Sequence, residues 1–179
     1  MVESRIILNN ILAGIITGII IAMLFYLFTL NNVNEFIYQL IIKQLVINGL
    51  DPNEAAKVAN QTLSTIKGIE WIYPLGIILN MFFISIILGI INDYILRKTS
   101  MKPYMAAIIT GLVLLLVFHL LPLALVSATM GKWIIDLYNE YIGFHIQVIM
   151  TITYTILLTI FTSFKGPWSR ILESKPKIY

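Results

Sequence analysis

The stretch PYMAAIITGLVLLLVFHLLPLALVSATM, residues 103–130, contains no Asp, Glu, Lys or Arg and is apolar along nearly its whole length. A helix needs about 20 residues to cross the hydrocarbon core of a bilayer. Because lipid offers no hydrogen-bond partners to backbone N–H and C=O groups, an apolar run of this length is typical of a transmembrane helix. The stretch therefore predicts a membrane span.

Three further apolar runs, residues 6–30, 71–96 and 142–164, are each at least twenty-three residues long. Over the whole chain of 179 residues, 59% are hydrophobic and only 12% are charged, against about 25% charged in ordinary soluble domains. Four spans leave room for one sizeable loop, residues 31–70, and a short tail, residues 165–179. We therefore expect an all-α, multi-pass membrane protein: a single membrane domain built as a four-transmembrane-helix bundle.

The basic residues alternate between the two predicted sides of the membrane. Cytoplasmic loops carry an excess of Lys and Arg, so this alternation predicts that the N- and C-termini are cytoplasmic and that residues 31–70 lie outside the cell membrane. Eight basic residues fall on the predicted inner side: Arg5, Arg97, Lys98, Lys102, Lys165, Arg170, Lys175 and Lys177. Four fall on the outer side: Lys43, Lys57, Lys67 and Lys132.

The loop 31–70 has the pattern of an amphipathic helical hairpin. Its first part is too short to cross the membrane, so this helix lies in the interface, re-enters or extends the first span. Asn48 and Gly49 interrupt the pattern. A second helix is then expected, with Asp51 as its cap and Pro52 at its first position. We expect the hairpin to sit over the outer mouth of the bundle, either as a packing cover or as a lid that gates or docks a partner.

Pairs of small residues spaced four apart recur in the first three spans. Such pairs let helix backbones approach closely, either within the chain or between copies in a homo-oligomer. Pro122 should kink the third span, because it has no N–H for the carbonyl of Phe118. The predicted packing residues are Gly14, Gly18, Ser85, Gly89, Ala107, Gly111 and Pro122.

Several polar residues fall at membrane depth. Counting the helical rise from the outer boundaries places His119, Asn80 and Thr151 in one layer, about 13–15 Å deep. Polar groups inside a membrane usually face the bundle interior and find partners. One interpretation is that Asn80 or a Thr hydroxyl satisfies a neutral His119 and fixes helix register. The other is a polar path or a cation site, for which the candidates are His119, Asn80, His145, Gln147, Thr151 and Asn92.

The sequence also excludes several function classes. There are no cysteines, so disulfides and thiolate metal sites are excluded. Two histidines alone do not define a metal site, so whether the protein binds a metal stays unknown. No complete catalytic or phosphate-binding motif is present, so we expect neither an enzyme nor a cofactor. No basic run with interleaved aromatic residues suggests nucleic acid. The expected partners are the lipid bilayer and either further copies of this chain or other membrane subunits.

Two motifs resemble a known family. The first span carries LAGIITG at residues 12–18, and the third carries FHLLP at residues 118–122, with an outer helical loop between the first two spans. This layout resembles the CbtA family, small membrane proteins proposed to be cobalt-transporter subunits. The resemblance implies a small transport component, such as a permease subunit for a metal cation. The alternative is a non-transporting accessory or scaffold subunit of a larger membrane complex.

Overall fold

The structure is a computed structural model that describes residues 4–99 and 101–163, and this part of the chain is helical with no strands. The predicted tail, residues 165–179, lies outside the described residues. In chain order the helices are α1 (Ser4–Phe28), α2 (Leu30–Ile47), α3 (Pro52–Ile66), the 3₁₀ turn Lys67–Ile69, α4 (Ile72–Thr99), α5 (Pro103–Val113), the π-helix Leu114–Leu120, α6 (Leu121–Met130), α7 (Trp133–Tyr141) and α8 (His145–Ser163).

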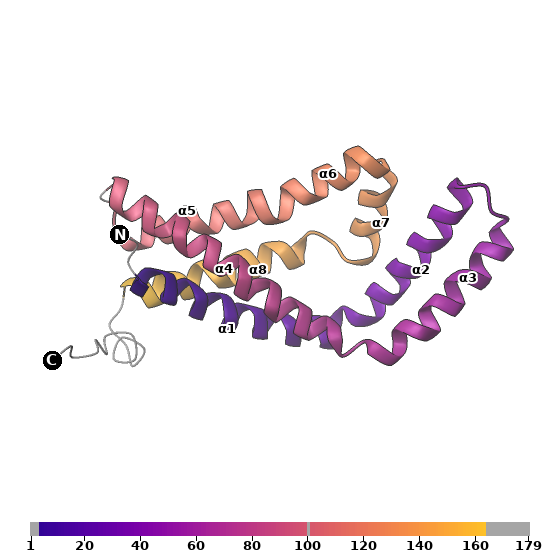
Figure 1. Ribbon diagram of the computed structural model, residues 1–179, viewed down its shortest axis with the longest axis horizontal. Helices are drawn as coiled ribbons and strands as arrows, with labels where there is room; N and C mark the ends of the chain where they lie inside the picture. The colour runs from indigo at the N-terminus through magenta and orange to yellow at the C-terminus, as the bar shows by residue number, and fades with distance from the viewer. Residues whose placement is uncertain (1–3, 100, 164–179) are drawn as a thin grey trace.

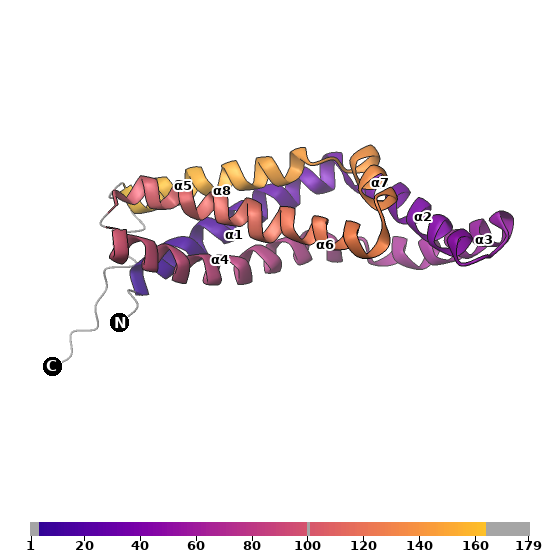
Figure 2. The ribbon, with the colours of Figure 1, turned by 90° about the horizontal axis from the view of Figure 1, so that it is seen from above.

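The long helices run side by side along the longest axis of the molecule (Figures 1 and 2). α1 packs along α4, α8 packs against both α1 and α5, and α4 also contacts α5. The start of α1, the end of α4, the start of α5 and the end of α8 lie at one end, which we call the N-terminal end. The α2–α3 hairpin projects from the other end, which we call the hairpin end.

The prediction of an all-helical protein with four span-length helices is confirmed. Within the described residues, four helices are long and apolar enough to cross a membrane: Arg5–Phe28, Ile72–Thr99, Pro103–Met130 and His145–Ser163. Large apolar side chains such as Phe83, Leu125 and Ile152 are exposed on their outer faces. Since lipid is as apolar as these side chains, the pattern is consistent with a multi-pass membrane protein.

The core is formed where the span-length helices meet. Met81, Leu88, Leu114, Tyr154 and Leu158 come from α4, the π-helix and α8, and all five are fully buried. Because α1 and α4 approach closely, small residues occupy their contact face. A Cβ placed on Gly89 would lie 3.0 Å from the Cα of Ile7.

The same close approach explains most of the predicted small-residue positions. A Cβ on Gly18 would lie 3.0 Å from the Cα of Ile78, and one on Gly14 would overlap the side chain of Ser85. On the other side of the molecule, Gly111 of α5 faces Thr155 of α8. These glycines therefore lie at contacts within this chain, and Ala107 is fully buried one turn before Gly111.

The hairpin forms as its sequence predicts, but its position differs. Asp51 caps α3, since its carboxylate accepts a hydrogen bond of 2.8 Å from the backbone N–H of Asn53, and Pro52 is the first helical residue. Gly49, at φ +92°, provides the turn that joins α2 to α3. The pair projects away from the ends of α1 and α4 rather than over them (Figure 1). The reason is that α2 extends α1 with an interruption only at Thr29.

A helix that the sequence analysis did not predict, α7, lies beyond the end of α6 and packs against α2. It also moves the start of the fourth span. The predicted span began at residue 142, but Ile142 caps the end of α7 and Gly143, at φ +75°, turns the chain. α8 therefore begins at His145.

Candidate functional site

The third span-length helix, Pro103–Met130, changes its helical geometry in the middle. Residues Leu114–Leu120 form a π-helix, and the N–H of Leu121 donates to the carbonyl of Leu116, five residues back. Pro122 follows directly, in the first turn of α6. The sequence predicted a kink at Pro122, and the structure places this wider turn immediately before it. A proline removes one bond from the α-helical series, and a π turn shifts that series by one residue.

The π-helix carries His119. The side chain is half-buried, and its Nε2 atom is buried without a hydrogen-bond partner among residues 4–99 and 101–163. The π-helix packs against α8, where the hydroxyl of Thr151 is also buried and makes no hydrogen bond within the described chain. A buried polar atom without a partner costs about 1–3 kcal/mol. Two such atoms therefore lie on contacting elements, and we take this region as the candidate functional site.

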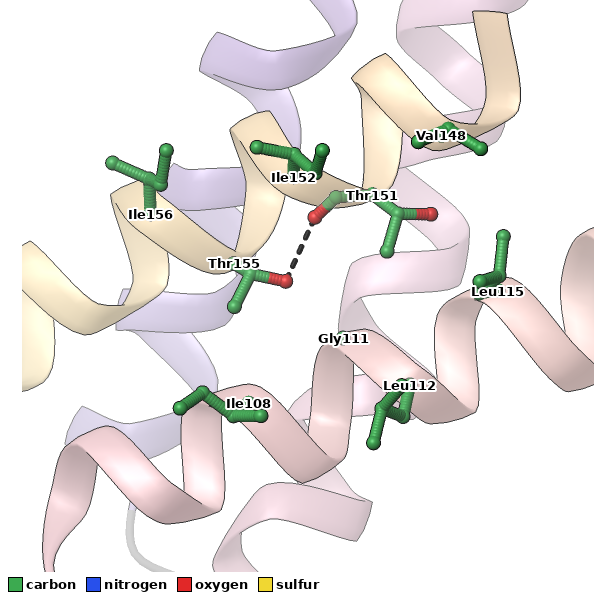
Figure 3. A pocket seen from close by; sticks show the side chains of 9 residues that line it. All are labelled: Ile108, Gly111, Leu112, Leu115, Val148, Thr151, Ile152, Thr155 and Ile156. Atoms are coloured by element: carbon green, nitrogen blue, oxygen red, sulfur yellow. Dashed lines mark hydrogen bonds between the residues drawn. The ribbon is translucent and has the colours of Figure 1, made fainter. Parts of the chain in front are cut away.

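Thr151 also borders a groove between α5 and α8 (Figure 3). The groove encloses about 300 Å³ and is lined mainly by aliphatic side chains such as Ile108, Leu112 and Ile156. Beside Thr151, the hydroxyl of Thr155 donates 2.7 Å to the carbonyl of Thr151, as the dashed line marks. Thr155 thus satisfies its own hydroxyl within α8, whereas Thr151 does not.

The other predicted site residues do not join this pair. Asn80 is exposed on α4, and the buried Nε2 of His119 makes no hydrogen bond to it. Asn92 is fully buried on α4, twelve positions further along, which corresponds to about 18 Å of helix. The residues of the predicted polar path are therefore spread over different faces and depths of the molecule.

His145 and Gln147 lie at the hairpin end of α8. His145 is exposed and lines a small groove of about 130 Å³ beside Thr29, the residue between α1 and α2. The side-chain amide of Gln147, in its hydrogen-bonding orientation, reaches the carbonyl of Phe144 at 3.0 Å and the hydroxyl of Tyr138 on α7. These two residues therefore belong to the junction between α8 and its neighbours rather than to the His119 site.

One buried polar contact was missed by the sequence analysis. The hydroxyl of Tyr154 on α8 donates a hydrogen bond of 2.7 Å to the side-chain oxygen of Asn10 on α1. Asn10 in turn donates 2.8 Å to the carbonyl of Ile6. Both side chains are fully buried. The sequence shows that Tyr154 and Asn10 are polar residues within apolar runs, but it does not show that their side chains are in contact.

No group of three or more His, Cys, Asp or Glu side chains that could hold a metal occurs in the part of the chain that the structure describes. His119 and His145 differ in setting, one being half-buried on the π-helix and the other exposed at the start of α8. Arg97 and Asp93 form an ion pair on α4: Arg97 Nε lies 2.9 Å from Asp93 Oδ1, one helical turn away.

The fold and the site together define a helical protein with the features of a multi-pass membrane protein and one polar site on a π-helix. No family model matches the chain, and comparisons with curated proteins and with solved structures find no match either. The function is therefore inferred from the geometry of the site.

Proposed function

We propose that this protein is a small membrane transport component that passes a cation or another small polar solute, in an oligomer or with a partner subunit. The observation that carries the proposal is the buried Nε2 of His119, which has no hydrogen-bond partner within the described residues. An imidazole can take up or release a proton near neutral pH and can bind metal cations. A polar group of this kind inside a span is a functional candidate by default.

The packing interpretation of His119 is weaker than the transport interpretation. It requires Asn80 or a Thr hydroxyl to satisfy the imidazole, yet Asn80 is exposed and both Nε2 of His119 and the hydroxyl of Thr151 lack partners among the described side chains. The resemblance to the CbtA family favours the same proposal.

Assembly with further subunits is part of the proposal. α6 contributes no buried residue, although it forms the last ten residues of the third span. Four spans in one chain rarely enclose a complete path, so further helices are needed to close one. Because α6 has no buried residue, its outer face and that of the π-helix offer a surface that another helix can cover. We propose a homo-oligomer or a complex with other membrane subunits.

The second candidate function is a non-transporting accessory or scaffold subunit. It is favoured by the apolar character of the grooves along the span-length helices, such as the one of about 340 Å³ between α1 and α4, lined by Ile19, Met23 and Ile78 among others. Apolar grooves suit helix packing and offer little to a hydrated ion.

Flux measurements on the purified protein in lipid vesicles separate the two functions. The probes are protons, monovalent cations and divalent cations, each tested alone. Under the transport proposal, His119→Ala lowers the flux at least tenfold while the thermal unfolding midpoint changes little. Asn80→Ala, which alters an exposed polar residue at similar depth, is the matched control and keeps the flux.

Under the accessory function, wild-type vesicles carry no flux and His119→Leu keeps or raises thermal stability, because it removes a buried polar atom that has no partner. Vesicles that pass none of these ions, either with this protein alone or with candidate partner subunits, would contradict the transport proposal.

A further inference from the structure

A further groove lies between α2 and α7, at the hairpin end of the molecule. It encloses about 550 Å³, more than each of the three grooves described above. Aliphatic side chains such as Ile42, Val46 and Leu137 line it, and so do two charged side chains, Lys43 of α2 and Glu140 of α7. The groove therefore presents one positive and one negative group beside an apolar surface.

Lys43 forms the positive end of the groove. Its Nζ atom lies over the ring of Trp133, 5.5 Å from the ring centroid. The side chain is exposed and makes no ion pair with a carboxylate of the described residues. Its charge is therefore available to an anionic group in the groove.

Glu140 forms the negative end, together with Glu35 of α2. Partial burial and then the carboxylates of Glu140 and Glu35 raise the pKa of Tyr141, so both carboxylates lie near the Tyr141 hydroxyl. The carboxylate of Glu35 also accepts a hydrogen bond of 2.9 Å from Gln39, whose side chain lines the groove. Since Glu35 and Lys43 are two helical turns apart on α2, about 12 Å along the axis, the opposite charges stand at separate places.

The position of α7 places the groove beside the ends of two span-length helices. α7 begins three residues after Met130, the last residue of one such helix, and ends four residues before His145, the first residue of another. The ring of Phe36 packs edge-on against that of Tyr138, with centroids 6.1 Å apart, and so holds α2 beside α7. α7 also carries one Trp and two Tyr, which are residues enriched where a membrane meets water. When the span-length helices cross a bilayer, the groove lies at the level of the lipid headgroups.

The charges of the groove specify the kind of headgroup. A phosphate group is attracted by Lys43, and an ammonium group is attracted by Glu140 and Glu35. An anionic headgroup without an ammonium group meets two carboxylates and only one lysine, so it is partly repelled. A headgroup that carries both groups satisfies both ends, while the aliphatic lining accommodates the apolar start of its acyl chains.

We propose that the groove between α2 and α7 binds a zwitterionic phospholipid, with its phosphate at Lys43 and its ammonium group at Glu140. The inference requires that the span-length helices cross a membrane. It does not involve His119, so it stands whether or not the protein transports ions.

Native mass spectrometry of the purified whole protein in detergent measures the binding of single lipids. The probes are phosphatidylethanolamine, which carries a phosphate and an ammonium group, and phosphatidylglycerol, which carries the phosphate alone, with the same acyl chains. We expect one phosphatidylethanolamine to bind saturably and about tenfold more tightly than phosphatidylglycerol, because only the first has a partner for Glu140. Equal affinities for the two lipids would overturn the proposal.

Variants at Lys43 and Glu140 test the two ends separately. Lys43→Gln should weaken the binding of both lipids about tenfold, because both carry the phosphate. Its control is Lys57→Gln, which removes an exposed charge on α3 and should leave both affinities unchanged. Glu140→Gln should weaken the binding of phosphatidylethanolamine and strengthen that of phosphatidylglycerol, a reversal that loss of folding does not produce.

The control for Glu140→Gln is Asp136→Asn, which removes an exposed acidic group on α7 outside the lining of the groove. Effects of Lys43→Gln and Glu140→Gln no larger than those of their controls would overturn the proposal. Free phosphoethanolamine in excess should leave the bound lipid in place, because it has no acyl chains for the aliphatic lining. Complete displacement would assign the groove to a soluble zwitterion and overturn the lipid as its occupant.

Discussion

Tyr154 and Asn10 are 144 positions apart in the chain, yet their side chains form a buried hydrogen bond of 2.7 Å between α8 and α1. Tyr154 is the largest fully buried side chain among the described residues. The bond thus joins the last span-length helix to the first in the interior, where no solvent competes for either partner.

Tyr154→Phe should lower the free energy of unfolding by about 1–3 kcal/mol, because the oxygen of Asn10 is left buried without its donor. Thermal unfolding in detergent measures the change. Tyr94→Phe, which removes a hydroxyl from an exposed ring on α4, is the control and should change the midpoint little. Equal midpoints for Tyr154→Phe and the wild type would show that the bond adds nothing to stability.

Gly14→Ala should destabilise the protein by about 1–3 kcal/mol, because the new methyl group overlaps Ser85 on α4. Gly76 is also helical, but nothing lies within 4 Å of a Cβ placed there. Gly76→Ala should therefore be neutral or stabilise by about 0.5–1 kcal/mol. Both are read from thermal unfolding midpoints, and an equal effect of the two substitutions would contradict the close packing of α1 on α4.

Asp51→Ala should weaken α3 by about 0.5–2 kcal/mol through loss of its hydrogen bond to the N–H of Asn53. The expected result is faster proteolysis within the hairpin, with the span-length helices still intact by circular dichroism. Asp51→Ser keeps an N-cap oxygen and should restore most of the protection. Unchanged cleavage in Asp51→Ala would remove the capping argument.

The predicted topology places both termini in the cytoplasm and the hairpin outside. In this cysteine-free chain, Asn60→Cys on α3 should react with an impermeant thiol reagent added outside the cell. Thr99→Cys, exposed at the N-terminal end of the molecule, should react only after the membrane is opened. The reverse labelling pattern would invert the assignment.

Burial raises the pKa of Tyr138 on α7 from 10.0 to about 12. The unfolded chain therefore loses this proton near pH 10, while the folded protein keeps it until about pH 12. The free energy of unfolding should consequently fall as the pH rises from 10 to 12. Below pH 10 this group keeps its proton in both states, so it causes no change of stability with pH there. The phenolate absorbance of the wild type minus that of Tyr138→Phe should show one group titrating near pH 12. A midpoint near pH 10 would show that the ring is solvated.

The helical class and the four span-length helices could be predicted because the apolar runs are long and carry few charges. The start of α3 was also predictable, since Asp51 and Pro52 act on backbone groups only a few residues away. α7 was missed because the segment 131–141 is short and directly follows an apolar run, a pattern that is typical of a connection between two spans. Its signal was present: Trp133, Ile134, Leu137 and Tyr138 recur at helical spacing.

The site was less predictable, because depth along a span does not fix the face on which a residue lies. His119, Asn80 and Thr151 have similar depths, yet Asn80 is exposed on α4 while Thr151 is buried. The π-helix adds to this difficulty, since it rotates the positions after it relative to the regular period. The bond from Tyr154 to Asn10 depends on which helices are neighbours, and that arrangement follows from the packing of the whole chain.

The near-continuity of α1 and α2 has a mechanical consequence. At Thr29 the backbone still bonds in the helical manner, with its N–H donating 2.9 Å to Phe25 and its carbonyl accepting 2.9 Å from Val33. The two helices, of 25 and 18 residues, therefore share one hydrogen-bonded backbone that changes direction where α1 meets α2 (Figure 1). A displacement of the α2–α3 hairpin would therefore act on α1 directly through this hydrogen-bonded backbone.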